Sequence, residues 1–183
     1  MTQAIRIIVA ATLAVALATA ARSEKDASRQ ADGPWRIETS KDSGSQPENV
    51  ALVTSAIDRD ATFTVGCKPD LRLYYLAVRD ARLTELAAGS EATLAIRYPG
   101  EEPTRWQAAS RGDGSVIVQE IVQQTAFTLI LLSLKQTAAT TAELSIDDHQ
   151  WTFRLENFSA ALQDLIAACG FPPGPGAPQR RRR

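Results

Sequence analysis

The stretch Ala61-Thr-Phe-Thr-Val-Gly-Cys67 carries the alternation of apolar and polar residues that decides the fold. In an extended chain Phe63, Val65 and Cys67 fall on one side, and Thr62 and Thr64 fall on the other. Period-two alternation is typical of a strand with one buried face and one wetted face. We therefore predict a half-buried strand here, with Cys67 pointing into the core.

The same alternation recurs along the chain. It is clear at 93–98, 142–146 and 151–155. The last two stretches enclose Asp147-Asp-His-Gln150, a short polar connection that suits a hairpin. Less regular patterns predict five more strands, at 35–39, 50–56, 71–78, 104–109 and 115–120.

A first helical spacing occurs in the stretch 124–135. Its apolar residues recur at three- and four-residue steps: Phe127, Ile130, Leu131 and Leu134. The segment is short and contains β-branched residues, so a buried strand remains an open alternative.

The second helical spacing, near the C-terminus, is more regular. An apolar stripe runs along one side of a helix: Phe158, Leu162, Leu165, Ile166 and Cys169. Asn157 or Ser159 can cap its beginning, and Gly170 stands where such a helix ends. We predict a helix over 159–168. The expected fold class is α+β, a mostly antiparallel β-sheet or sandwich with this C-terminal helix packed on it.

The chain contains two cysteines, Cys67 and Cys169. Each lies on the apolar face of its predicted element, so both thiols point toward the same core. In an oxidising compartment they are expected to pair. Two buried free thiols are the alternative, and a redox-active pair is disfavoured because Cys-x-x-Cys spacing is absent.

Residues 1–20 have a charged start, an apolar middle and the ending Ala18-Thr-Ala20. This arrangement is typical of a secretory signal peptide. The apolar run is shorter than the roughly 20 residues that a spanning helix needs. We therefore expect cleavage, no transmembrane segment afterwards, and a bacterial periplasmic or secreted location.

Composition also divides the remaining chain. Residues 21–33 are charged and lack apolar periodicity, so we expect a flexible lead-in. Residues 34–170 contain all predicted elements and form a single β-rich domain. Residues 171–183 are rich in Pro and Gly and end in four arginines, which predicts a disordered tail.

The charge of the chain argues against nucleic acid as a partner. The full sequence has 20 Lys and Arg against 21 Asp and Glu. Without Arg6 and the tail arginines, the body keeps 15 basic residues against 21 acidic ones, so it repels phosphate backbones. The tail arginines themselves are either a solvated end or a weak contact for an anionic surface; they are Arg180, Arg181, Arg182 and Arg183.

Residues that could carry catalysis are few. His149 is the single histidine, and no Gly-x-Ser-x-Gly motif occurs. With Asp147 and Asp148 it suits a polar turn better than a metal site. Glu101 and Glu102 precede a proline in a predicted solvated loop. We predict no catalytic, cofactor-binding or metal-ligating residue and no cofactor.

The tripeptide Arg111-Gly112-Asp113 has two interpretations. An exposed Arg-Gly-Asp loop can engage adhesion receptors. The flanking glycine and serine residues are equally what a reverse turn between two strands requires, and we favour the turn.

A succession of short motifs carries a family resemblance. These are Trp35, Asn49-Val-Ala-Leu52, Phe63-Thr-Val-Gly-Cys67, Leu73-Tyr-Tyr75, Trp106-Gln-Ala-Ala-Ser110, Phe127 with Leu131, Trp151-Thr-Phe-Arg-Leu155 and the run from Phe158 to Gly170. The order resembles the type VI secretion-associated VasI family of small exported proteins. Where its members have an acidic pair after the first Trp, this chain has Ser40-Lys-Asp-Ser-Gly44.

The resemblance implies an accessory role in the cell envelope, with no catalytic residues to transfer. Together with the absence of a catalytic motif, it leads us to expect a non-enzymatic protein that binds an envelope or secretion-machinery protein. The alternative is a small periplasmic hydrolase, or an inhibitor of a cell-wall hydrolase.

Overall fold

A single antiparallel sheet of ten strands organises the molecule. The computed structural model describes residues 27–30, 33–40 and 48–173. The strands are β1 (Ala27–Gln30), β2 (Arg36–Ser40), β3 (Asn49–Ser55), β4 (Thr62–Lys68), β5 (Leu73–Arg79), β6 (Glu91–Arg97), β7 (Thr104–Ser110), β8 (Ser115–Gln119), β9 (Thr141–Ile146) and β10 (His149–Arg154). The helices are the 3-10 helix η1 (Ala81–Glu85), α1 (Glu120–Gln136) and α2 (Phe158–Cys169).

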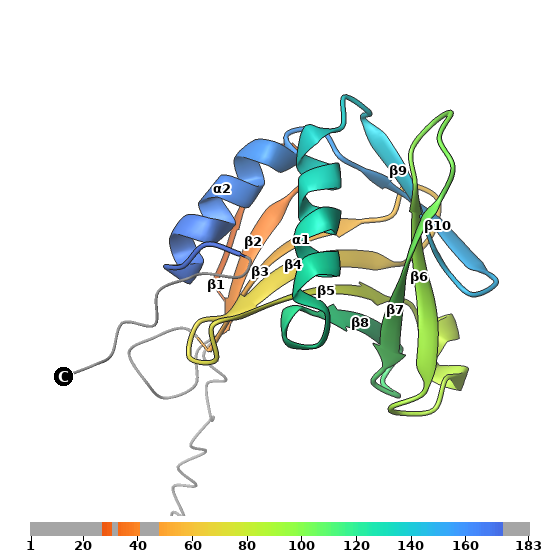
Figure 1. Ribbon diagram of the computed structural model, residues 1–183. Helices are drawn as coiled ribbons and strands as arrows, with labels where there is room; N and C mark the ends of the chain where they lie inside the picture. The colour runs from red at the N-terminus through yellow and green to blue at the C-terminus, as the bar shows by residue number, and fades with distance from the viewer. Residues whose placement is uncertain (1–26, 31–32, 41–47, 174–183) are drawn as a thin grey trace, which may run out of the picture.

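The sheet curls until its two sides meet (Figure 1). Its strand order is β1-β2-β3-β4-β5-β8-β7-β6-β9-β10. Ala56, just after β3, forms an antiparallel bridge with Phe153 of β10. The backbone N–H of Ile57 also donates to the carbonyl oxygen of Thr152, at 2.8 Å. The curl thereby encloses an inner face and leaves an outer face in water.

The predicted alternation decides which side chains point inward. Phe63, Val65 and Cys67 are fully buried, as expected. The register sets Leu52 opposite Val65, and Val65 opposite Leu76, so apolar side chains of neighbouring strands form continuous rows. All nine strands expected from the sequence are present, including the hairpin of β9 and β10, and the α+β fold class is confirmed.

Two helices cover the inner face (Figure 1). In α2 the buried side chains follow the predicted stripe, with Ala161 buried and Ile166 only partly buried. In α1 the buried side chains include Ile130, Leu131 and Leu134. The 124–135 stretch is therefore helical rather than a buried strand. No helix in the described part of the chain is both long and apolar enough to cross a bilayer.

The predicted disulfide joins Cys67 of β4 to Cys169 at the end of α2. The domain continues past the predicted limit at 170, because Phe171 is buried with only 6% of its surface exposed. Its carbonyl oxygen accepts a hydrogen bond from the Tyr74 hydroxyl at 2.6 Å, and the two ring centroids are 4.9 Å apart. The tail prediction for 171–183 is thus wrong at its start.

The structure also bears on the lead-in and on the arrangement of the sheet, and two further expectations lie outside the described residues. The predicted lead-in, 21–33, contributes β1, because backbone pairing with β2 requires no apolar periodicity. The strands form one curled sheet rather than a two-sheet sandwich. The predicted signal peptide, 1–20, and the tail arginines lie outside the described residues.

Candidate functional site

The outer face of the sheet carries a hollow with a volume of about 670 Å³. We call it the outer-face hollow. Its floor is formed by Val53 of β3, Thr64 of β4, Ala77 of β5 and Ile117 of β8. It opens on the side of the sheet opposite to both helices.

The strand register explains why the surface is hollow there. Val53 pairs with Thr64, Thr64 with Ala77, and Ala77 with Ile117, so the four floor residues stand in one row across four strands. Small or medium side chains occupy this row. On β5 the row is bounded by two longer side chains, Tyr75 and Arg79, which lie two residues from Ala77 on the same face.

Tyr75 forms one wall of the hollow, and Gly66 makes its position possible. The two residues pair directly across β4 and β5. A Cβ atom at Gly66 would lie 2.2 Å from Cζ of Tyr75, so the ring lies flat on the glycine backbone. The Tyr75 hydroxyl donates to Oδ1 of Asn49 at 2.9 Å. Burial raises the pKa of Tyr75, which keeps the phenol neutral and able to donate.

Cationic side chains form the opposite wall. Arg79 of β5 pairs with Ser115 of β8, and the backbone N–H of Arg111 donates to the carbonyl oxygen of Ser115 at 2.9 Å. The two arginines therefore flank Ser115 on neighbouring strands. None of the ion pairs between described residues includes Arg79 or Arg111.

The remaining charges lie toward the other end of the hollow. Nε of Arg36 contacts Oε1 of Glu38 at 2.6 Å, so these two charges neutralise each other. Glu48 and Asp70 line the same end as Lys68. The hollow is thus cationic where β5, β8 and the β7–β8 turn meet, and of mixed charge toward β2.

The Arg-Gly-Asp tripeptide forms the turn between β7 and β8, as favoured from the sequence. Gly112 and Gly114 both have positive φ, which this tight turn requires. The Asp113 carboxylate accepts hydrogen bonds from the backbone N–H and the hydroxyl of Ser115. Those bonds, and to a smaller degree the charge of Arg79, lower the pKa of Asp113. Asp113 therefore holds the turn, while Arg111 faces the hollow.

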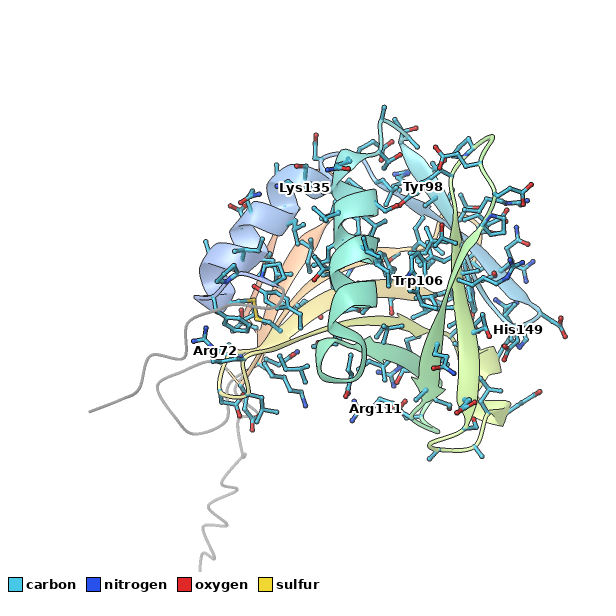
Figure 2. The ribbon with its side chains drawn as sticks, viewed as in Figure 1. Arg72, Tyr98, Trp106, Arg111, Lys135 and His149 are labelled. Atoms are coloured by element: carbon cyan, nitrogen blue, oxygen red, sulfur yellow. A yellow bond between two sulfur atoms is a disulfide. The ribbon has the colours of Figure 1, made fainter. Side chains whose placement is uncertain are left out.

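His149 and its neighbours do not join this site. Asp147 and Asp148 form the two-residue turn between β9 and β10, and His149 is the first residue of β10. Figure 2 shows Arg111 at the lower end of the molecule and His149 apart from it, beside the β9–β10 turn. In the described ranges, no group of three or more His, Cys, Asp and Glu side chains is placed to hold a metal ion.

Glu101 and Glu102 line a separate hollow of about 520 Å³ beside the β6–β7 connection. Glu143 lines it too and forms an ion pair with Arg97. Both Glu101 and Glu102 are exposed, as expected for a solvated loop.

Asp80 is a buried charge that the sequence pattern did not indicate. Its Oδ2 accepts hydrogen bonds from Nε1 of Trp151 at 2.7 Å and from Nη2 of Arg82 at 2.8 Å. The hydrogen bonds from Arg82 hold the pKa of Asp80 well below its usual range. Because Trp151 belongs to β10 and Asp80 follows β5, this cluster ties opposite sides of the curled sheet together.

Comparison of the chain with known proteins identifies no relative. The chain matches no protein-family model, and no curated protein or solved structure is significantly similar to it.

The hollow itself was missed in the sequence. The signal was present in the strands of 62–68 and 73–79, where Thr64, Gly66 and Ala77 interrupt the large outward-facing residues. Small outward residues are recognised as a hollow only when the register places them side by side.

Proposed function

We propose that this chain is an exported, non-enzymatic accessory protein of the bacterial cell envelope, and that it binds a protein partner through the outer-face hollow. The observation that carries the proposal is the row of small floor residues between a tyrosine wall and an arginine wall. The arrangement combines shape, apolar surface and charge on rigid strands, which are the requirements of a recognition site.

Two features support binding rather than hydrolysis. Three carboxylates line the hollow, Glu38, Glu48 and Asp70, and Glu38 is held in an ion pair with Arg36. The pKa of Tyr75 is raised, so its phenol remains a neutral donor. His149, the only histidine of the chain, lies at the start of β10 instead. A nucleophilic hydrolase usually places a base beside its nucleophile.

Export and family membership belong to the same proposal. The disulfide between Cys67 and Cys169 suits an oxidising compartment such as the periplasm. The residues 1–20 read as a signal peptide. With the succession of motifs that resembles the VasI family, these features favour a partner from the type VI secretion machinery.

The proposal is tested by in-cell crosslinking and affinity capture with a matched pair of variants. Thr64→Arg places a long side chain on the floor of the hollow. Thr93→Arg makes the same change at an exposed position of β6 that does not line the hollow. We expect wild type and Thr93→Arg to recover the same secretion-machinery subunit, and Thr64→Arg to lose it while keeping the disulfide and the thermal midpoint.

A third form, truncated after Pro173, removes the tail without disturbing the buried Phe171. It should capture the same subunit as the full mature chain. Equal capture by Thr64→Arg would overturn the hollow as the binding site. A cell-wall cleavage activity abolished by His149→Ala or Glu101→Ala in a folded protein would replace the proposal with the hydrolase alternative.

A further inference from the structure

Resting on the proposed function, we infer that the outer-face hollow takes an extended acidic segment of the partner, about six residues long, whose carboxylate lies between Arg79 and Arg111. The segment crosses the strands along the row of floor residues. Its orientation is fixed by charge, with the acidic end toward the β7–β8 turn.

The length follows from the strand spacing. The row runs from Arg36 of β2 through the four floor residues to Ile117 of β8, which spans five adjacent strands. Adjacent strands lie about 4.8 Å apart, so the row is roughly 19 Å long. An extended chain advances about 3.3 Å per residue, so about six residues fill it. A single small anion would occupy only one end.

The floor selects a peptide with apolar side chains. Val53, Ala77 and Ile117 present aliphatic surface, and Leu71, at the edge of the hollow, is 56% exposed. Burying such surface is favourable for a partner with apolar residues at alternate positions.

The cationic wall selects the acidic end. Arg79 and Arg111 flank Ser115 on neighbouring strands and have no ion-pair partner among the described residues within 4.0 Å. Asp113, two residues from Arg111, is engaged by Ser115. Glu91 lines a neighbouring hollow with Arg111 but forms no ion pair with either arginine. The two guanidinium groups therefore have donors available for a further carboxylate.

The rest of the molecule sharpens this selectivity. The chain without Arg6 and the tail arginines carries 21 acidic residues against 15 basic ones, so it repels an acidic peptide elsewhere. At the β2 end of the row, Arg36 is paired with Glu38. That end does not favour a second negative charge, which fixes the direction of the peptide.

The test is an NMR titration of the mature full-length protein with blocked hexapeptides. The probe is Ac-Glu-Ser-Leu-Ser-Leu-Ser-NH2, compared with the same peptide carrying Lys in place of Glu, and with inorganic phosphate. We expect saturable shifts at Thr64, Ala77 and Ile117 with the Glu peptide only. Arg79→Gln and Arg111→Gln should each weaken its binding about tenfold, which is the loss of one charge-assisted hydrogen bond.

Arg105→Gln is the matched control, because Arg105 is an exposed arginine of β7 that does not line the hollow. It should leave the dissociation constant unchanged. Equal binding of the Glu and Lys peptides, or an unchanged affinity in both hollow variants, would overturn the inference. Phosphate binding as tightly as the peptide would show a simple anion site and overturn the extended segment.

The inference can fail alone. If the captured partner depends on Thr64 but not on Arg79 or Arg111, the hollow binds a partner of other chemistry and the proposed function stands. If the Thr64→Arg variant captures the partner as well as wild type does, both the proposed function and the inference are wrong.

Discussion

The inner and outer faces of β3, β4 and β5 are built from alternate residues of the same strands, yet they differ in how completely their side chains fill the available space. On the inner face, large apolar side chains such as Leu52, Phe63 and Leu76 fill all the space. On the outer face, Thr64, Gly66 and Ala77 leave space open. The inner face is therefore sensitive to lost volume, and the outer face to added volume.

The comparison also separates stability from recognition. Packing on the inner face is shared by both helices and by β3 to β10, with Ile37 of β2 packed against it, so a change there affects the whole fold. Side chains on the outer face contact few neighbours beyond the sheet itself. Substitutions on the inner face should thus change stability, and substitutions on the outer face should change binding.

Removal of a large inner side chain should give the greatest loss. Phe63→Ala deletes a fully buried ring whose centroid lies 5.6 Å from that of Phe153 and 6.1 Å from that of Trp35. We expect the free energy of unfolding to fall by about 4 kcal/mol. Urea denaturation measures it. Thr62→Ala, on the outer face of the same strand, is the control and should change stability by less than about 0.5 kcal/mol.

Loss of the disulfide should rank second. It joins residues 102 positions apart and holds α2 against β4. The double variant Cys67→Ala/Cys169→Ala should unfold with about 3 kcal/mol less free energy, because its unfolded chain regains conformational freedom. Chemical denaturation of oxidised wild type and the variant gives the difference. A stability equal to that of oxidised wild type would mean that packing alone fixes the helix.

The buried carboxylate of the inner face should make stability depend on acid pH. The pKa of Asp80 is lowered in the folded protein, so its contribution is present above the unfolded value of about 3.9 and is lost as pH falls below it. Asp80→Asn should cost about 2 kcal/mol at pH 7, since the amide is uncharged and its NH2 group replaces an oxygen that accepts from the Arg82 backbone N–H and Nε.

The pH profile separates this electrostatic role from simple packing. The stability difference between wild type and Asp80→Asn should shrink as the pH is lowered from 5 toward 2, measured by denaturant titration at each pH. A difference that stays constant over this range would contradict the lowered pKa.

Added volume on the outer face should have the smallest effect on folding. In Gly66→Ala the new methyl group meets the Tyr75 ring, which must swing away from Asn49. We expect a loss of about 1 kcal/mol, the net result of one broken hydrogen bond and the greater strand preference of alanine. In a Tyr75→Ala background the same change should be neutral or stabilising, and thermal unfolding of the four proteins forms the double-mutant cycle.

Alternation explains why so much of the inner face could be predicted. The spacing of Phe63, Val65 and Cys67 predicts both the strand and its buried face. The apolar stripe of α2 predicts the helix and its buried face in the same way. Because these two patterns place Cys67 and Cys169 on buried faces, they predicted the disulfide. The segment of α1 was ambiguous because it is short and contains β-branched residues, so its pattern does not separate helix from strand.

The outer face could not be predicted because it depends on register. The local sequence does not predict that Thr64 lies beside Ala77. Nor does it predict that Arg111, in the β7–β8 turn, lies on the same side of the hollow as Arg79. β1 escaped notice because it is held by backbone pairing, and Phe171 because its aromatic contact with Tyr74 lies far away in sequence. Such non-local contacts are properties of the assembled sheet.

The disulfide closes most of the chain into a covalent ring. Cys67 and Cys169 enclose β5 to β10, η1 and α1, together with the exposed connection at 99–102. A protease that cuts one backbone bond inside this ring opens it without dividing the molecule, so the two pieces separate only on reduction. In a compartment that contains proteases, the survival of a nicked chain as one molecule then depends on the redox state of a single bond.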